Sequence, residues 1–334
     1  MRFWFSRLYL FLMIVMAVLV VNGCGYSDEL HHRHTLMKLL WQERYAELDQ
    51  AIAQAYVKKE KGKLSSNQLR TRIWQLQNVD PAFVPRFNNW VAHQDSSHAY
   101  LARGWFRLQQ ALNIRGDRPA SEIPPEKHAK VRELMQLGAD DMQQALSKDT
   151  RCAMCIGGKI FANMHLGLQD DDLIEMALLI DPTLFQPVDA HFVSLYPGWG
   201  GSETEMMKFI HHIGTLNGTE KTVQRLNAMF YVQRGLAKHF GSMDYAGALS
   251  EYETAISHSP NHFALEGAAK IYSLQGEHGK AAAALEMNLR ENDEWDLYTI
   301  EALAQAYFAQ DRNSDGKRMM KKRDELLQRF RKGE

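Results

Sequence analysis

The sequence is short of cysteine, proline and net charge, and each shortage narrows what the protein can be. Only 3 cysteines and 9 prolines occur among 334 residues, and 39 Lys and Arg are balanced by 40 Asp and Glu. The lack of a basic excess argues against a nucleic-acid binder, because such proteins meet phosphates with clustered positive charge. Three cysteines leave no second pair to complete a zinc site. We therefore expect no nucleic-acid partner and no metal.

Short motifs that mark common enzymes are missing as well. The chain has no Gly-x-Ser-x-Gly nucleophile elbow, no His-Glu-x-x-His helix and no Gly-x-x-x-x-Gly-Lys phosphate loop. The neighbouring His211 and His212 would diverge by about 100° on a helix, so at most one of them faces any given site. The sequence predicts no catalytic residue and no cofactor.

Helix-forming residues, by contrast, are abundant. Ala, Leu, Gln, Met and Glu recur throughout, and they lose little side-chain freedom on becoming helical. From residue 35 onward apolar residues recur at helical intervals, and no stretch alternates apolar and polar residues for the length of a strand. With 45% hydrophobic and 24% charged residues, the chain is predicted to be a folded, all-α protein.

The N-terminus reads as an export signal. Arg2 and Arg7 precede an apolar run of 14 residues, Leu8 to Val21. A membrane-spanning helix needs about 20 apolar residues, so the run suits a cleaved signal peptide over residues 1–23 better than a permanent span. The histidine-containing stretch that follows, residues 24–34, is predicted to be a solvated linker.

A cysteine follows the apolar run at once. The sequence Val21-Asn22-Gly23-Cys24 resembles the lipobox of bacterial lipoproteins, in which cleavage leaves a lipid-modified cysteine as the first residue, although Asn22 departs from the usual small residue. The resemblance implies that Cys24 is lipidated and holds the protein to a membrane. Gly25 and Tyr26 lack the Asp of an inner-membrane retention signal, which favours a periplasm-facing outer-membrane lipoprotein over an inner-membrane one. An ordinary secretory signal and an uncleaved anchor are the alternatives.

Helix-capping patterns divide the next part of the chain. Ser65 with Gln68, Asp80 with Pro81, and Asp95 or Ser96 are each placed to begin a helix. These starts predict an N-terminal helical region over residues 35–115. The Pro- and Gly-rich stretch from 115 to 125 is the predicted linker that ends it.

A repeated pattern occupies the remainder of the chain. Segments beginning at Ala145, Ala177 and Ala255 share one arrangement, and two Ala-x-x-Tyr pairs, at Ala269 and Ala304, stand 35 residues apart. These features resemble the two helices of a tetratricopeptide repeat, in which small residues let helices approach closely. The resemblance implies a tetratricopeptide-like helical repeat, or α-solenoid, over residues 126–334, with an irregular insertion around 183–202.

The insertion ends in the turn Trp199-Gly200-Gly201-Ser202. Ser202 can cap the Met-rich helix that follows, and the glycines permit a sharp turn. This turn resembles that of an uncharacterised bacterial family of tetratricopeptide-like proteins, which implies a fold and no activity. Trp199 has two interpretations: it either anchors its own loop or lies at the mouth of a groove and contacts a partner.

Cys152 and Cys155 form the one motif in the sequence that is typical of reactive chemistry. They stand three residues apart at a predicted helix start, where the helix dipole lowers a thiol pKa. A local disulfide is the simplest interpretation for an exported protein, and unpaired packing cysteines, a redox-active pair and metal ligands are the alternatives.

Taken together, these features favour a non-catalytic, membrane-anchored scaffold or adaptor of the bacterial cell envelope. It would bind a protein or peptide that the sequence does not identify, through the concave side of the solenoid. The alternative is an enzyme, either a thiol-disulfide oxidoreductase that uses Cys152 and Cys155 or a cell-wall hydrolase with a helical scaffold.

Overall fold

The computed structural model describes residues 35–74, 76, 80–116, 123–168, 171–291 and 297–332. Every regular element within these residues is a helix, which confirms the all-α prediction. The signal peptide, Cys24 and the linker 24–34 lie outside the described residues. None of the described helices combines the length and the apolar character that a membrane span requires.

The described chain forms two compact units that divide between Ser202 and Glu203. We call them the first unit (residues 35–202) and the second unit (residues 203–332). The Pro- and Gly-rich stretch from 115 to 125 was the expected boundary of the N-terminal helical region. It lies inside the first unit, because the helices on either side of it pack along one another.

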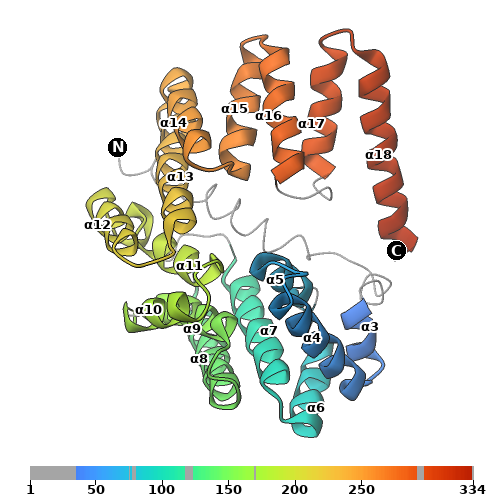
Figure 1. The fold of residues 1–334 in the computed structure, drawn as a ribbon, viewed down its shortest axis with the longest axis vertical. Helices are drawn as coiled ribbons and strands as arrows, with labels where there is room; N and C mark the ends of the chain where they lie inside the picture. Colours follow the sequence, from blue (N-terminus) through green and yellow to red (C-terminus); the bar gives the residue numbers. More distant parts are fainter. Residues whose placement is uncertain are drawn as a thin grey trace. The chain divides into compact units, whose positions relative to one another are not determined.

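The first unit contains helices of very different lengths (Figure 1). In chain order they are α3 (Thr35–Trp41), α4 (Tyr45–Glu60), α5 (Ser66–Trp74), the 3-10 turn η1 (Pro81–Phe83), α6 (Val84–Gln94), α7 (Ser97–Arg115), α8 (Pro125–Lys148), α9 (Ala153–Leu166), α10 (Asp171–Ile180), α11 (Gln186–Ser194) and the 3-10 turn η3 (Pro197–Trp199).

The predicted caps begin their helices. The amide of Gln68 donates to the Ser65 hydroxyl at 3.1 Å while the Ser65 amide donates to the Gln68 side chain at 2.9 Å. Asp80 accepts from the Ala82 amide at the start of η1, and Ser96, rather than Asp95, accepts from the Ala99 amide at the start of α7. These bonds satisfy amides that a helix start otherwise leaves unpaired.

Aromatic side chains form the centre of the first unit. Phe83, Phe87 and Trp90 are fully buried, and the rings of Phe87 and Phe106 stack with their centroids 4.5 Å apart. Each such ring removes a large apolar area from water, and this burial stabilises the fold by about 25 cal/mol per Å².

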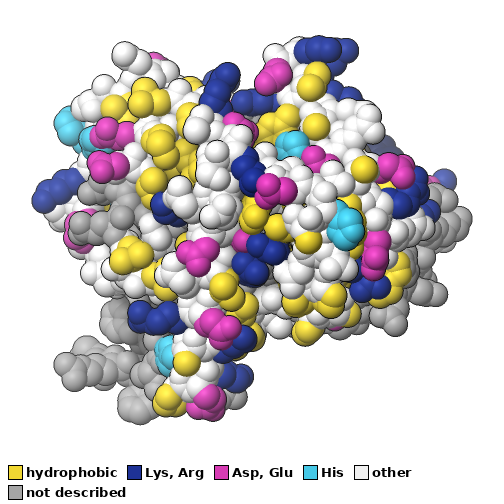
Figure 2. All heavy atoms as spheres, turned by 90° about the horizontal axis from the view of Figure 1, so that it is seen from below, with side chains coloured by type: hydrophobic (Ala, Val, Ile, Leu, Met, Phe, Trp, Pro, Cys, Tyr) yellow, Lys and Arg dark blue, Asp and Glu magenta, His cyan; other side chains and the backbone are white. Residues whose placement is uncertain are grey.

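On the face shown in Figure 2, Lys and Arg are interspersed with Asp and Glu. That face therefore presents no large field of one sign.

Two buried carboxylates tie helices of the first unit together. Asp141 on α8 accepts two hydrogen bonds from Arg103, at 2.7 and 3.0 Å, and one from Arg107 at 2.7 Å, both on α7. Such charge-assisted bonds fix the angle between the two helices.

The second carboxylate is Asp181, after α10. It lies 2.8 Å from the ammonium group of Lys59 on α4 and accepts from the hydroxyls of Ser66 and Thr183 at 2.6 and 2.7 Å. Burial raises the pKa of Asp181, but these bonds outweigh it, so the pKa lies below its ordinary value. Residues more than a hundred positions apart are thereby held together.

The second unit is more regular. Its helices are α12 (Glu203–Gly214), α13 (Glu220–Leu236), the π-helical segment η4 (Ala237–Ser242), α14 (Tyr245–His258), α15 (His262–Leu274), α16 (His278–Glu291), α17 (Leu297–Phe308) and α18 (Asn313–Lys332). Consecutive helices pack as neighbours, and α13 with α14, α15 with α16 and α17 with α18 stand side by side in Figure 1.

Small residues allow these helices to pack closely against one another. Tyr252 on α14 is fully buried, and a Cβ added to Gly235 or Gly267 would stand 2.6 or 2.5 Å from its ring. The ring therefore fills the space that glycine leaves on α13 and α15. Further along, Ala281 and Ala282 pack with Tyr307 in a core made largely of alanine. Sequential helix pairs with small residues at their contacts are consistent with a helical repeat.

Candidate functional site

The cysteine pair lies at the start of α9. Cys152 caps the helix, its sulfur accepts from the Cys155 amide at 3.2 Å, and the two sulfur atoms are bonded, 1.98 Å apart. Both residues are buried, with 2% and 0% of their surface exposed. A redox partner has no access to a pair so enclosed, so the arrangement suits a structural clamp better than a reactive site.

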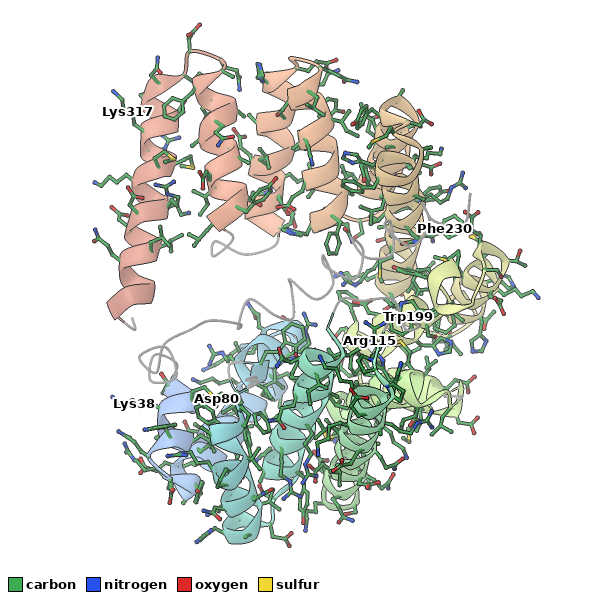
Figure 3. The ribbon with its side chains drawn as sticks, turned by 180° about the vertical axis from the view of Figure 1, so that it is seen from behind. Lys38, Asp80, Arg115, Trp199, Phe230 and Lys317 are labelled. Carbon is green, nitrogen blue, oxygen red and sulfur yellow. A yellow bond between two sulfur atoms is a disulfide. The ribbon has the colours of Figure 1, made fainter. Side chains whose placement is uncertain are left out.

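The Trp199 turn packs against its own unit. Its ring meets the His165 ring edge to face at 5.3 Å between centroids, and the guanidinium of Arg115 lies 5.9 Å from the ring centre (Figure 3). Burial, and then the charge of Arg115, lower the pKa of His165 to about 4, so this imidazole is neutral at pH 7. These contacts support the interpretation of Trp199 as an anchor of its loop.

The two glycines of the turn have separate roles. Gly200 has a positive φ of 94°, a conformation that side chains disfavour, and it ends η3. At Gly201 a Cβ would stand 2.2 Å from the carbonyl oxygen of Leu195, so only glycine fits. Ser202 immediately precedes α12, where a capping residue belongs. The turn is thus shaped by backbone geometry.

The histidine pair on α12 gathers no ligands. His211 and His212 are both exposed, and no group of three or more His, Cys, Asp or Glu among the described residues is arranged to hold a metal ion. Their helix carries the buried Met206 and the exposed Met207.

The second unit has a groove between α15 and α17, which we call the α15–α17 groove. It has a volume of about 330 Å³ and is floored partly by α16. Eleven residues line it, four from α15, two from α16, four from α17 and one that directly follows α17: Glu266, Ala269, Lys270, Ser273, His278, Leu285, Tyr298, Ala302, Gln305, Ala306 and Ala309.

The groove exists because its walls are small. Ala269 on α15 and Ala302 on α17 line it, where larger side chains would take up the space, and the lining residues Ala306 and Leu285 are buried. Tyr298 stands at one end with 63% of its surface exposed. A hollow with alanines in its walls, polar side chains around it and an exposed aromatic at its edge is typical of a surface that accepts a side chain from another molecule.

Polar side chains around the groove fall into two groups. Glu266 accepts from the Thr299 hydroxyl at 3.0 Å and lies 3.4 Å from the His262 ring, so its carboxylate is already engaged. Lys270, Ser273 and Gln305 are exposed, and among the described residues their side chains have no hydrogen-bond or ion-pair partner. The ammonium group of Lys270 lies 5.6 Å from the Phe240 ring.

Sequence reasoning did not single out this groove. It identified Ala269 and Ala304 as close-packing positions, yet the lining residues Ala302 and Ala306 stand two residues before and after Ala304, on another face of α17. The available signal was the alanine spacing at 302, 306 and 309 behind an exposed tyrosine. That spacing is also typical of an ordinary helix contact, so it did not distinguish a groove from a packed interface.

Comparison with known proteins identifies no relative: no family model matches the chain, and no curated protein matches it. The fold and the groove therefore define the protein only as an all-α protein of sequentially packed helices with an open groove on its second unit.

Proposed function

We propose that this protein is a non-catalytic scaffold or adaptor of the bacterial cell envelope that binds a protein or peptide in the α15–α17 groove. The observation that carries the proposal is the groove itself, a hollow of about 330 Å³ with alanines in its walls, edged by an exposed tyrosine and by exposed polar side chains. We assign the second unit to the tetratricopeptide-like repeats, which is supported by the spacing of Ala269 and Ala304 and by the sequential pairing of the helices.

A binding role accounts for the groove better than a catalytic one. Catalysis needs a nucleophile, acid or base held in reach of a substrate. The one carboxylate in the groove, Glu266, is committed to Thr299 and His262. The buried cysteine pair is enclosed in the other unit.

Filling the groove tests the proposal. Ala302 is half-buried in the wall, so Ala302→Trp should occupy the hollow without displacing the core. In crosslinking pull-downs from native envelopes, we expect the specific partner bands to fall at least about tenfold for this variant. Ala283→Trp is the matched control, because Ala283 is exposed on α16 and lies outside the groove. Equal recovery of the same partners by the wild type and both variants would disprove groove binding.

The anchor is a separate part of the proposal. It is supported by the resemblance of Val21–Cys24 to a lipobox and by the apolar run before it. Replacing the cysteine, in Cys24→Ala, should remove the mass of the lipid and release the chain from the membrane fraction, where we place it in the outer membrane. A variant that stays in that fraction would refute anchoring by lipid, while leaving groove binding intact.

A further inference from the structure

Helix α10 has more apolar side chains than its packing in the first unit uses. Seven of the ten residues of Asp171–Ile180 are apolar. The helix packs on α9 and α11 (Figure 1), and its inner side buries Ile174, Ala177 and Leu178. A helix at the surface of a folded unit normally turns its apolar residues toward the core and its polar residues toward water. The outer side of α10 departs from that rule.

We call this outer side the α10 outer face, and it consists of Asp172, Glu175, Met176 and Leu179. All four residues are exposed, and each stands three or four positions from two of the others, so they share one side of the helix. Met176 is 38% exposed and Leu179 is 86% exposed, the largest fraction among the large apolar side chains of the described residues. Leu168, in the turn before α10, adds another exposed apolar side chain, at 56%. Neighbouring exposed apolar residues of this kind mark a surface that another molecule covers.

Charge narrows what can cover this face. Asp172 and Glu175 lie about one helical turn from Met176 and Leu179, and residues 160–202 contain no Lys or Arg. An anionic lipid surface attracts cations and repels carboxylates. A second copy of this chain that docked through the same face would bring like charges together, because a two-fold contact places each patch against itself. The face therefore suits a partner that carries positive charge beside apolar residues.

The spacing on the face suits a partner that is itself helical. An amphipathic helix presents apolar residues at intervals of three and four, with Lys or Arg at the margins of the apolar stripe. The aliphatic stems of Lys and Arg lie along apolar surface while their charged ends reach acceptors beyond it. Met176 contributes an unbranched, adaptable side chain that fits against different apolar partners.

We propose that the α10 outer face binds a basic amphipathic helix of a partner protein. The apolar stripe of that helix covers Met176 and Leu179, and its Lys or Arg side chains form charge-assisted hydrogen bonds with Asp172 and Glu175. The site lies in the first unit and uses no residue of the α15–α17 groove. The inference therefore goes beyond the proposed function and does not depend on it.

Binding of designed peptides tests the inference. The probe is a short fluorescein-labelled peptide of Leu and Lys whose sequence places every Leu on one side of a helix. One comparison peptide has Glu in place of Lys, and another has the same composition with Leu spread around the helix. Fluorescence anisotropy measures binding to the full chain in non-ionic detergent micelles, and micelles alone are titrated with each peptide to subtract uptake by detergent. We expect the Lys–Leu helix to bind at least about fivefold more tightly than either comparison peptide.

Substitutions then locate the binding. Leu179→Ser should weaken binding of the Lys–Leu helix at least about fivefold, because it removes the most exposed apolar contact of the face. Leu274→Ser is the matched control, because Leu274 is also exposed, at 66%, and lies in the second unit. Asp172→Asn combined with Glu175→Gln should reduce the preference for the Lys–Leu helix over its Glu–Leu counterpart. Asp140→Asn, on the exposed side of α8, should leave that preference unchanged. Circular dichroism of each variant verifies that it is folded.

Other results would overturn the inference. Equal binding of the Lys–Leu helix by the wild type and Leu179→Ser would place the peptide elsewhere, and loss of binding only in Ala302→Trp would place it in the groove. Without peptide, slower hydrogen exchange of residues 172–180 in vesicles of phosphatidylethanolamine and phosphatidylglycerol than in micelles would assign the face to lipid. The same protection rising with protein concentration would assign it to a second copy. The groove is tested with its native partners, so each of these failures leaves the proposed function in place.

Discussion

The two units of the protein solve the problem of packing helices in different ways. In the first unit, buried carboxylates join helices through polar bonds: Asp141 joins the consecutive helices α7 and α8, and Asp181 reaches Lys59 and Ser66, which are far away in sequence. In the second unit, neighbouring helices meet through glycine and alanine, as Gly235 and Gly267 do around Tyr252. Polar ties thus define one unit and small residues the other.

The difference explains where an open surface remains. A contact between neighbouring helices that relies on small residues can recur from one helix pair to the next. It leaves the first helix of one pair beside the first helix of the next pair, with short side chains between them. The α15–α17 groove lies between two such helices. In the first unit, the bulky rings of Phe83, Phe87 and Trp90 occupy the interior. The comparison yields four predictions.

The largest loss of stability is expected when the space that Tyr252 fills between Gly235 and Gly267 is left empty. Tyr252→Ala removes a fully buried ring and should lower the free energy of unfolding of the second unit by about 3–5 kcal/mol. Hydrogen exchange read by mass spectrometry reports each unit separately. Tyr245→Ala serves as the control, because Tyr245 is 41% exposed and should cost less than about 1 kcal/mol. Equal destabilisation of both units would show that they unfold together and would contradict the view that each unit is stabilised in its own way.

Removing a polar tie should act on the other unit. Asp141→Asn takes away the negative charge that Arg103 and Arg107 share at distances of 2.7 to 3.0 Å. The first unit should lose about 3 kcal/mol, because two largely buried cations are left without an anion. Asp140→Asn is the neighbouring control, since Asp140 is exposed. An unchanged hydrogen-exchange profile in α7 and α8 would mean that aromatic packing alone sets their pairing.

A pH titration should affect both units through one buried histidine in each. Burial, and then the charge of Lys270, lower the pKa of His239 in the second unit to about 4, as burial and Arg115 do for His165 in the first. The unfolded imidazole has a pKa near 6.5, so between pH 6.5 and 4 the unfolded state binds a proton that the folded state refuses. Stability is therefore complete above pH 6.5 and declines as the pH falls through this window.

Substituting each histidine in turn shows which one causes the loss of stability at low pH in each unit. Each histidine should account for about 2 kcal/mol of that loss. His239→Gln should flatten the decline of the second unit alone and His165→Gln that of the first, as measured by thermal unfolding and hydrogen exchange from pH 7 to 4. Below about pH 4 the first unit should decline further, because the lowered pKa of Asp181 means that its stabilising bonds are lost as the carboxylate is protonated. A decline that neither substitution alters would contradict this assignment.

The smallest effect should come from the cysteine pair. The bond between Cys152 and Cys155 closes a loop with a sequence separation of only 3, so replacing both by Ser should cost the first unit about 1–2 kcal/mol and the second unit nothing. Alkylation with and without reductant, read on the peptide that contains both residues, checks the bond directly. Two free thiols in envelope-extracted protein would rule out the clamp.

Local features of the fold were predictable from the sequence, and the groove was not. The caps at Ser65, Asp80 and Ser96 are confirmed because each depends on a side chain and an amide two or three residues away. The boundary expected between 115 and 125 did not separate compact units, because whether α7 packs on α8 depends on Arg103, Arg107 and Asp141, which are far apart in sequence. Proline and glycine mark where a helix ends, and they carry no information about what packs beyond the turn.

The sequence by itself determined that the chain is helical, where several of its helices begin, and that alanine recurs at regular intervals in its second half. These properties depend on neighbours within one or two turns. The tertiary structure alone decided which alanines are packed and which line a groove, because Ala281 and Ala302 are chemically identical and differ only in what lies opposite. The same reason explains why Glu266 is bonded to Thr299, since that hydroxyl comes from another helix.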